Sequence, residues 1–211
     1  MASLTIEKLR SGLTPYLPSR TLEPLAKLIY DHQISIRITK NRSTKLGDYR
    51  PPYDGKGHQI SINGTLNPYQ FLVTLLHEIA HCFTFIQYKN TVAPHGEEWK
   101  NQFKKMLEPF IKHHIFPNDI EDALIKHIKK MKASSCSDPN LLMVLKSYDE
   151  RDENHPFVHL ESLPVLMRFE FKEKTYVKGE KRRTRIVCTE EISGKQFLFH
   201  PIAEVIPIFA K

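Results

Sequence analysis

The chain has 211 residues, a formal net charge of +7 at pH 7 and ordinary apolar and charged fractions, which favour a folded protein over a disordered one. A chain of this length can bury a substantial core, as one domain or as a main domain with a small appendage. No apolar stretch approaches the roughly 18 residues that a membrane span needs. Residues 1–18 contain no apolar signal core, so neither a membrane protein nor a secreted one is expected.

The cysteines and the basic charge suggest a compartment and a class of partner. Cys82, Cys136 and Cys188 lie far apart and form no CxxC pair, so a disulfide framework is not expected and a reducing cytoplasm is. The positive charge, with a pI near 9.2, suits an acidic partner such as nucleic acid. Solubility alone is an equally good explanation of that charge.

The first third of the chain predicts two short helices followed by a small sheet. Apolar residues recur at helical spacing over residues 4–13 and 22–30, with prolines between the two segments. Apolar and polar residues alternate over residues 34–39 and 58–62, as in half-buried strands, and residues 46–50 form a further candidate strand. Both alternating strands are also candidate edges to which an extended substrate could add.

A long helix is expected at the centre of the sequence. Asn67 is a suitable N-cap and Pro68 a suitable first helical residue. Residues 69–88 are apolar on nearly every side, which is typical of a buried central helix. Further helices are expected over residues 97–112, 118–132 and 139–147.

The character of the chain changes after residue 133. Residues 134–156 predict a short helix and a polar linker, and residues 157–211 contain short alternating stretches that predict a small β unit. The expected domains are therefore residues 1–133, 134–156 and 157–211.

The central helix contains an HExxH pattern formed by His77, Glu78 and His81. Residues four apart share one helix face, so the two imidazoles can take adjacent corners of a tetrahedral zinc site. Glu78 is then placed to take a proton from a zinc-bound water, whose pKa the metal lowers toward ~7. The competing interpretation is ordinary core packing, but burying these three groups in an apolar helix without a metal or partner is costly.

A catalytic zinc of this type needs a third protein ligand and one open position. His95 is favoured, because the turn formed by Pro94, His95 and Gly96 lets the chain return to the metal after the helix ends. We expect Gly96 to adopt a positive φ there. The competing ligands are Glu97, Glu98, His113 and His114.

The segment HEIAHCFTFIQYKNTVAPHGEEWKNQF resembles the SprT-like metallopeptidase family, whose members carry HExxH followed after a short loop by HGxxW or a similar sequence. The upstream segments LGDYR and ISINGTLNPYQFLVTLLHEIAH are also similar to that family. The resemblance covers about residues 15–130. It is weaker over residues 165–205, where YVKGEKRRTRIVCTEEISGKQFLF is similar to the C-terminal segment of some bacterial members.

The resemblance implies an α+β fold, in which a compact zincin-type domain packs the HExxH helix beneath a small sheet and a small C-terminal β unit follows. It implies a cytoplasmic zinc metallopeptidase related to the Spartan-type proteases, which degrade proteins crosslinked to DNA. The implied zinc ligands are His77, His81 and His95, and Glu78 is the implied base. An alternative is a DNA-binding or stress-response accessory protein with a structural or regulatory zinc site and no proteolysis.

The C-terminal unit departs from the family pattern. Many members end in a zinc ribbon of four cysteines, whereas this tail contains only Cys188, so a structural zinc is not expected there. The unit must then be held by its own core, which we expect to include Phe169, Phe171, Val187, Phe197 and Phe199.

A basic run in the C-terminal unit is a candidate DNA contact, because cations can bind the phosphate backbone. A solvated hairpin explains the run equally well. Its residues are Lys178, Lys181, Arg182, Arg183 and Arg185. We otherwise expect a monomer that acts on a protein or peptide substrate without contacting a membrane.

Several other side chains have more than one interpretation. Trp99 either anchors the helix after the loop, and so fixes His95, or forms a substrate wall. Tyr49 or Tyr53 is a candidate for stabilising the oxyanion of a tetrahedral intermediate. Cys82 points about 100° away from His81 on a helix and is expected in the core. The remaining histidines expected only at the surface or in packing are His58, His127, His155, His159 and His200.

Overall fold

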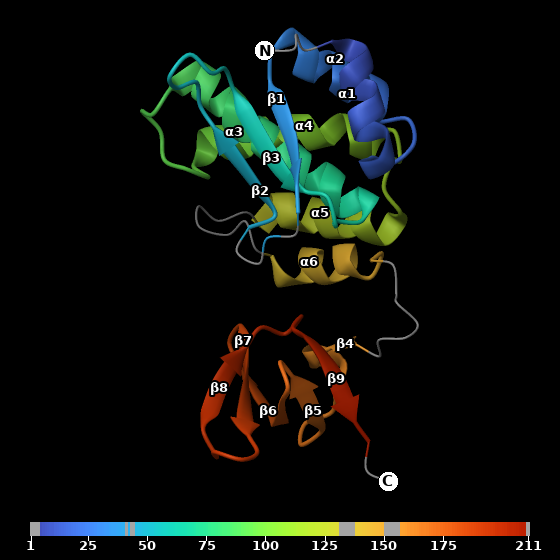
Figure 1. The fold of residues 1–211 in the computed structure, drawn as a ribbon, viewed down its shortest axis with the longest axis vertical. Helices are drawn as coiled ribbons and strands as arrows, with labels where there is room; N and C mark the ends of the chain where they lie inside the picture. Colours follow the sequence, from blue (N-terminus) through green and yellow to red (C-terminus); the bar gives the residue numbers. More distant parts are fainter. Residues whose placement is uncertain (1–4, 41, 43–44, 131–137, 150–156, 210–211) are drawn as a thin grey trace. The chain divides into compact units, whose positions relative to one another are not determined.

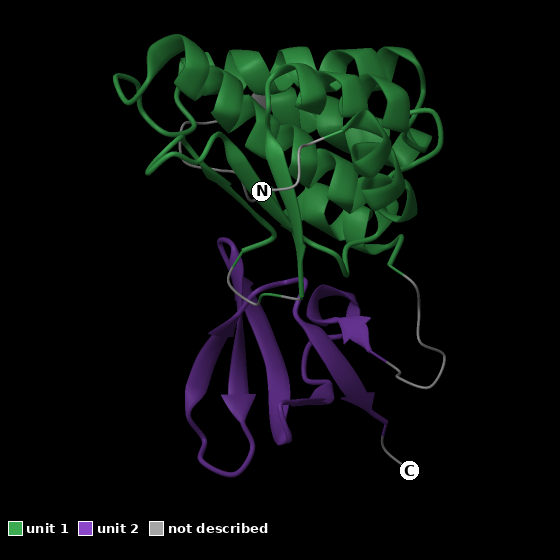
Figure 2. Cartoon of the chain, turned by 45° about the horizontal axis from the view of Figure 1, so that its top comes forward, with its two compact units in different colours: residues 1–149 green, residues 150–211 purple. Residues whose placement is uncertain are grey.

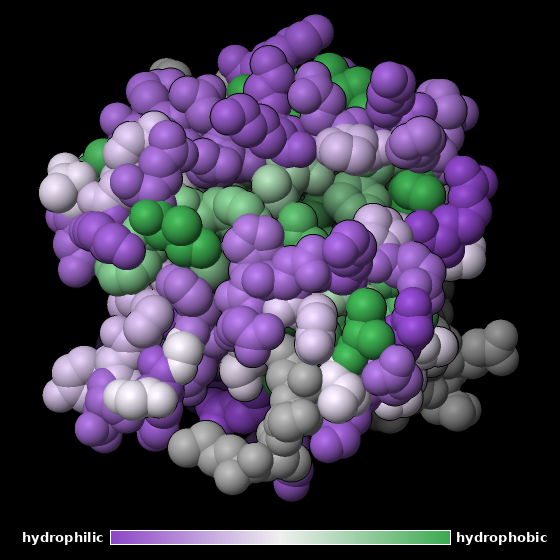
Figure 3. All heavy atoms as spheres, turned by 90° about the horizontal axis from the view of Figure 1, so that it is seen from above, coloured by the Kyte–Doolittle hydropathy of each residue, from purple (hydrophilic) through white to green (hydrophobic). Residues whose placement is uncertain are grey.

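The computed structural model describes residues 5–40, 42, 45–130, 138–149 and 157–209. Six α-helices and two β-sheets occur within these residues, so the fold is the expected mixture of α and β structure (Figure 1). The chain divides into two compact units, Met1–Asp149 and Glu150–Lys211 (Figure 2). On the face seen in Figure 3, hydrophilic residues predominate and hydrophobic residues form a band between them. Within the described part, no helix is long and apolar enough to span a membrane.

The first unit contains every described α-helix and a three-stranded sheet. Its helices are α1 (Ile6–Leu13), α2 (Leu22–Asp31), α3 (Pro68–Tyr88), α4 (Glu97–Lys112), α5 (Asn118–Lys130) and α6 (Pro139–Lys146), and its strands are β1 (Ser35–Thr39), β2 (Gly47–Arg50) and β3 (Gln59–Asn63). A short 3₁₀ turn, η1 (Thr14–Tyr16), follows α1. Each element expected from the sequence is present. Residues 4 and 131–132, at the expected ends of two helices, lie outside the described residues.

The strand order of this sheet is β1-β3-β2. Strand β3 pairs in parallel with β1 and antiparallel with β2. The prediction that β3 offers a free edge is therefore wrong, because hydrogen bonds to neighbouring strands occupy both of its sides. Within the described residues, the outer strands of the sheet are β1 and β2.

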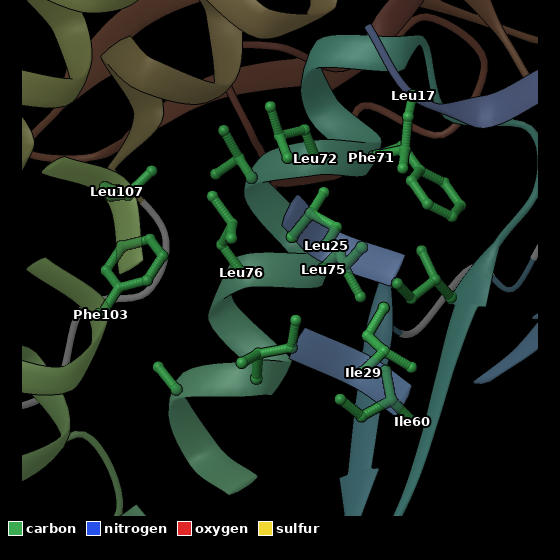
Figure 4. Close-up of a cluster of buried hydrophobic side chains, with 14 of the residues drawn as sticks. Leu17, Leu25, Ile29, Ile60, Phe71, Leu72, Leu75, Leu76, Phe103 and Leu107 are labelled. Atoms are coloured by element: carbon green, nitrogen blue, oxygen red, sulfur yellow. The ribbon is translucent and has the colours of Figure 1, made fainter. Parts of the chain in front are cut away.

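Helix α3 is the centre of the first unit. It begins as expected, with the Asn67 side chain accepting a hydrogen bond from the Gln70 amide and Pro68 in the first turn. It packs against β2 and β3 on one side and against α4 on another. Figure 4 shows this arrangement: Ile29 and Ile60 lie on the sheet side of α3, and α4 contributes the labelled side chains on the opposite side. A helix buried in this way holds its polar side chains in fixed directions.

Helix α6, which the sequence predicted as a short helix outside the first domain, packs into the core of the first unit. Leu141 and Leu145 are buried in the same apolar cluster as α3. The side-chain amide of Asn67, at the start of α3, donates to the Leu145 carbonyl at 2.8 Å and to the Asp149 carboxylate at 2.6 Å. The chain up to Asp149 therefore supports the central helix. The rest of the expected linker, residues 134–137 and 150–156, lies outside the described residues together with Cys136 and His155.

The second unit is an antiparallel sheet of six strands in the order β4-β9-β5-β6-β7-β8. Its elements are β4 (Val158–His159), the 3₁₀ turn η2 (Leu160–Ser162), β5 (Arg168–Phe171), β6 (Lys174–Arg182), β7 (Arg185–Glu190), β8 (Gln196–Phe199) and β9 (Glu204–Ile208). These strands agree with the β unit that the alternating pattern predicted.

The core of the second unit is mostly the expected one. Phe169, Val187 and Phe199 are buried, and Phe171 packs against the buried cluster. The prediction for Phe197 is wrong, because 40% of this residue is exposed. It lies on β8, the last strand of the sheet, where its ring centroid lies 5.8 Å from that of Tyr176.

Candidate metal centre

Three imidazoles converge in the first unit. The Nε2 atoms lie 3.2 Å apart for His77 and His81, 2.9 Å apart for His81 and His95, and 3.3 Å apart for His77 and His95. In a tetrahedral zinc site with the usual Zn–N bonds of about 2.0–2.1 Å, ligand nitrogens lie about 3.3–3.4 Å apart. The observed triangle is close to that size. The group could hold a metal ion, and among the described residues no other cluster of His, Cys, Asp or Glu has such an arrangement.

The histidines meet because a buried helix and the loop after it approach the same point. His77 and His81 lie one turn apart on α3. His95 arrives with a φ of 58°, a left-handed conformation that is uncommon for residues other than glycine and that collects at functional sites. The prediction for Gly96 is wrong, since its φ is −66°. Gly96 is nevertheless suited to its place, because a Cβ there would lie 3.0 Å from the Ala93 carbonyl oxygen.

Burial keeps the three histidines neutral. Burial, together with the charges of neighbouring histidines, lowers the pKa of His77 to about 3 and that of His81 to about 4. Burial also lowers the pKa of His95. All three rings are therefore unprotonated at pH 7, which is the form of imidazole that binds a metal.

Trp99 of α4 packs against all three imidazole rings. Its ring centroid lies 4.7 Å from that of His77, 5.2 Å from that of His81 and 4.7 Å from that of His95. It also stacks on Phe103 at 5.1 Å. Because only 1% of Trp99 is exposed, it is placed to anchor the site and not to form a substrate wall.

The competing ligands are not brought to this point. Glu97 is exposed and pairs with Lys100. Glu98 lines a separate hollow between the end of α3 and α4. His113 and His114 follow the end of α4, where the His114 ring lies 3.2 Å from the carboxylate of Glu121.

Glu78 lies beside the histidines, in an open pocket of about 310 Å³ that β2 completes. The β2 residues in its lining are Gly47, Asp48 and Tyr49. The strand approaches the carboxylate closely, because a Cβ at Gly47 would lie 2.5 Å from the Glu78 Oε1 atom and 2.8 Å from the Thr74 methyl group. Sequence reasoning gave Gly47 and Asp48 no role. The available signal was the LGDYR segment, which contains both.

The surroundings of Glu78 bring its carboxyl group close to neutrality. Only 7% of the residue is exposed. The pKa of Glu78 is raised to about 7, mainly by burial and also by the nearby Asp48 carboxylate, against the lowering effect of a hydrogen bond with the Tyr49 backbone and of the charges of Lys45 and Arg42. A carboxylate with a pKa near the working pH is suited to accept and return a proton.

The two tyrosines considered for the oxyanion are not poised for that role. Tyr53 is 83% exposed and is absent from the lining of the pocket. Tyr49 lines the pocket, but its hydroxyl lies 2.8 Å from Nδ1 of His58 and also interacts with the Cys82 thiol. Cys82 itself is fully buried, as the sequence predicted.

The basic run of the second unit is divided between the interior and the surface. Only 7% of Lys178 is exposed, and its ammonium donates to the carbonyls of Glu161 and Leu163. It is therefore not available to phosphate, contrary to expectation. Lys181 forms an ion pair with the Glu161 carboxylate. Lys181 is nevertheless exposed, as are the three arginines at the turn between β6 and β7, Arg182, Arg183 and Arg185.

Comparison with known proteins matches part of the chain to a family. Residues 23–118 match the SprT-like family, and this segment includes all of α3, the loop with His95 and all of α4. Neither a curated protein nor a solved structure matches the chain. The matched segment thus contains the three histidines, Glu78 and the β2 strand beside them.

Proposed function

We propose, from the premise that residues 23–118 of this chain belong to the SprT-like family, that the protein is a zinc-dependent metallopeptidase with a zincin-type catalytic domain. The observation that carries the proposal is the triangle of Nε2 atoms from His77, His81 and His95. It lies beside a buried carboxylate in an open pocket. Three protein ligands with an open side are the arrangement of a catalytic zinc, since a structural zinc has four.

The residues of the site have separate tasks in peptide hydrolysis. The three histidines would hold a zinc ion, which would supply a Lewis acid to polarise a carbonyl group and to lower the pKa of water. Glu78 accepts the proton of the attacking water and passes it to the leaving amine, and its position in the pocket beside the three histidines suits both transfers. Trp99 packs against the ligand rings and holds them in place.

The position of β2 suggests the form of the substrate. Strand β2 is an edge of the sheet and lines the pocket, so an extended polypeptide can add to it beside the reacting groups. Unfolded or extended segments of proteins are therefore the proposed substrates.

The direct test compares Glu78→Gln with the wild-type chain and with Glu97→Gln as a matched control. We expect the wild-type chain to bind one zinc ion and to cleave an unfolded protein. Glu78→Gln should keep the zinc and lose on the order of 10³-fold in kcat, because general base catalysis contributes roughly 10²–10⁴-fold. The control should behave as wild type, since Glu97 is exposed and outside the pocket. Undiminished cleavage by Glu78→Gln would contradict the mechanism.

DNA is the proposed partner of the second unit, on the strength of the exposed arginines at the β6–β7 turn. Phosphate contacts weaken binding steeply as salt increases. We therefore expect affinity for single-stranded DNA to fall with salt, and Arg183→Ala to reduce the slope by roughly 1 in log units. DNA binding by a zinc-loaded chain that cleaves no protein would favour the accessory role instead. A cytoplasmic location is part of the proposal, consistent with the free thiols of Cys82 and Cys188.

A further inference from the structure

Tyr49 connects three elements that meet behind the pocket. It lies on β2, and its backbone forms a hydrogen bond with the Glu78 carboxylate of α3. Its hydroxyl lies 2.8 Å from Nδ1 of His58, immediately before β3, and interacts with the Cys82 thiol of α3. One residue therefore binds the proposed catalytic base through its main chain and the surrounding fold through its side chain.

The Tyr49 hydroxyl is fully used within the protein. A phenol carries one proton and can accept a further hydrogen bond, and here it has one partner in His58 and another in Cys82. Whichever nitrogen of His58 carries the proton, the hydroxyl can donate to one neighbour and accept from the other. A proton used in this way is not directed at a substrate oxyanion, so the side chain is not placed to stabilise one.

His58 is itself fixed. Its carbonyl accepts a hydrogen bond from the Ser35 amide of β1 at 2.8 Å. Its ring lies 6.0 Å from that of Tyr49 and 6.1 Å from that of Phe85 on α3. The Tyr49 side chain is thus held by a residue that the sheet and α3 already immobilise.

Strand β2 needs such an anchor. It has four residues, and β3 is its one partner among the described strands. It is followed directly by Pro51 and Pro52, which cannot donate hydrogen bonds to a strand. A short edge strand with one partner moves easily. Yet β2 lies so close to Glu78 that no Cβ fits at Gly47. Any displacement of β2 therefore displaces the surroundings of the carboxylate.

We propose that Tyr49 and His58 are positioning residues for Glu78, and that the hydrogen bond between their side chains holds β2 against α3 so that the base keeps its place beside the metal site. The inference rests on the proposed function and deepens it. It assigns no direct part in the reaction to the Tyr49 hydroxyl.

The test uses the full-length, zinc-loaded chain with Tyr49→Phe, His58→Phe and the double variant. Each single variant should lower kcat about 10-fold, because small misplacements of a catalytic group are costly, with KM and zinc content unchanged. The double variant should be no worse than either single one, since both break the same bond. Amide hydrogen exchange at residue 49 should become about 10-fold faster, because its contact with Glu78 opens more often.

Two further variants separate positioning from other effects. His58→Asn places a polar atom where Nδ1 was and should restore most of kcat and of the exchange protection. Tyr53→Phe removes the hydroxyl of an exposed neighbour and should change neither.

The possible contradictions are distinct. Unchanged kcat and unchanged exchange in Tyr49→Phe would overturn the inference. A loss of 10³-fold in Tyr49→Phe beside a normal His58→Phe would also overturn it, by showing that the phenol acts on the reaction itself. Exchange at residue 49 does not depend on turnover. An inactive wild-type chain whose variants still exchange faster would therefore support the positioning role and count against the peptidase.

Discussion

The buried polar groups of the second unit and the histidine cluster of the first unit differ in the partners that they find. In the second unit, the buried Lys178 donates to two backbone carbonyls, and the buried Glu190 accepts from Lys174 and Ser193. In the first unit, three neutral imidazoles turn their Nε2 atoms toward one another beside the buried carboxylate of Glu78.

The comparison separates structural polar groups from candidate functional ones. Burying a polar group costs free energy that hydrogen bonds within the protein normally offset. Lys178 and Glu190 follow that rule and support the sheet. The histidine nitrogens converge on a point where a cation would be a better partner than another imidazole ring. The candidate functional site therefore lies in the first unit.

The largest expected effect is the loss of a proposed ligand. His95→Ala leaves two protein ligands and should weaken zinc binding by more than the ~10–100-fold that loss of an outer partner costs. Metal analysis after dialysis against a graded chelator measures the change. The matched control is His114→Ala, which removes a histidine outside the site and should leave zinc binding unaltered. Full zinc retention by His95→Ala would show that His95 is not a metal ligand, and the contrast with the structural polar groups of the second unit would then lose its basis.

Truncation tests where the first unit ends. A chain ending at residue 149 should keep its zinc and its stability, because it retains α6. A chain ending at residue 133 should lose about 4 kcal/mol of unfolding free energy, since Leu141 and Leu145 each contribute about 2 kcal/mol by burial. Denaturant unfolding of both chains gives the comparison. Equal stability would show that α6 adds nothing to the first unit.

Gly47→Ala tests the contact between β2 and Glu78. The added methyl group would lie 2.5 Å from the Glu78 Oε1 atom, so we expect cleavage to fall about 10²-fold while zinc is retained. Gly12→Ala on α1 is the control, because no atom lies within 4 Å of its Cβ position. That change should stabilise the helix by about 0.5–1 kcal/mol. Normal cleavage by Gly47→Ala would show that β2 can withdraw without consequence.

Lys178→Met tests the claim that buried polar groups of the second unit stabilise its fold and have no role in binding. Two carbonyls lose their donor, so unfolding of the second unit should become easier by about 2 kcal/mol. Thermal unfolding measures this, with exposed Arg183→Ala expected to change stability by less than ~0.5 kcal/mol. For DNA binding we expect the opposite ranking: Arg183→Ala should weaken binding more than Lys178→Met does. A salt dependence that falls with Lys178→Met and not with Arg183→Ala would contradict the assignment.

The sequence alone predicted what depends on local pattern. Asn67 and Pro68 marked the start of α3, and the spacing of His77 and His81 placed two imidazoles on one helix face, because helix geometry acts over a few residues. Glu78 followed from the same turn. His95 was favoured by its turn and by the family resemblance, and the structure brings it to the other two.

Only the tertiary structure decided which distant segments meet. The pairing of β2 with β3 puts Gly47 against Glu78 across some 30 residues of sequence, and packing assigns α6 to the first unit. The packing of the second unit buries Lys178, a residue of the basic run, so that it serves as a buried hydrogen-bond donor. The positive φ occurs at His95 and not at Gly96. Such outcomes depend on register and packing between distant elements, which no local pattern specifies.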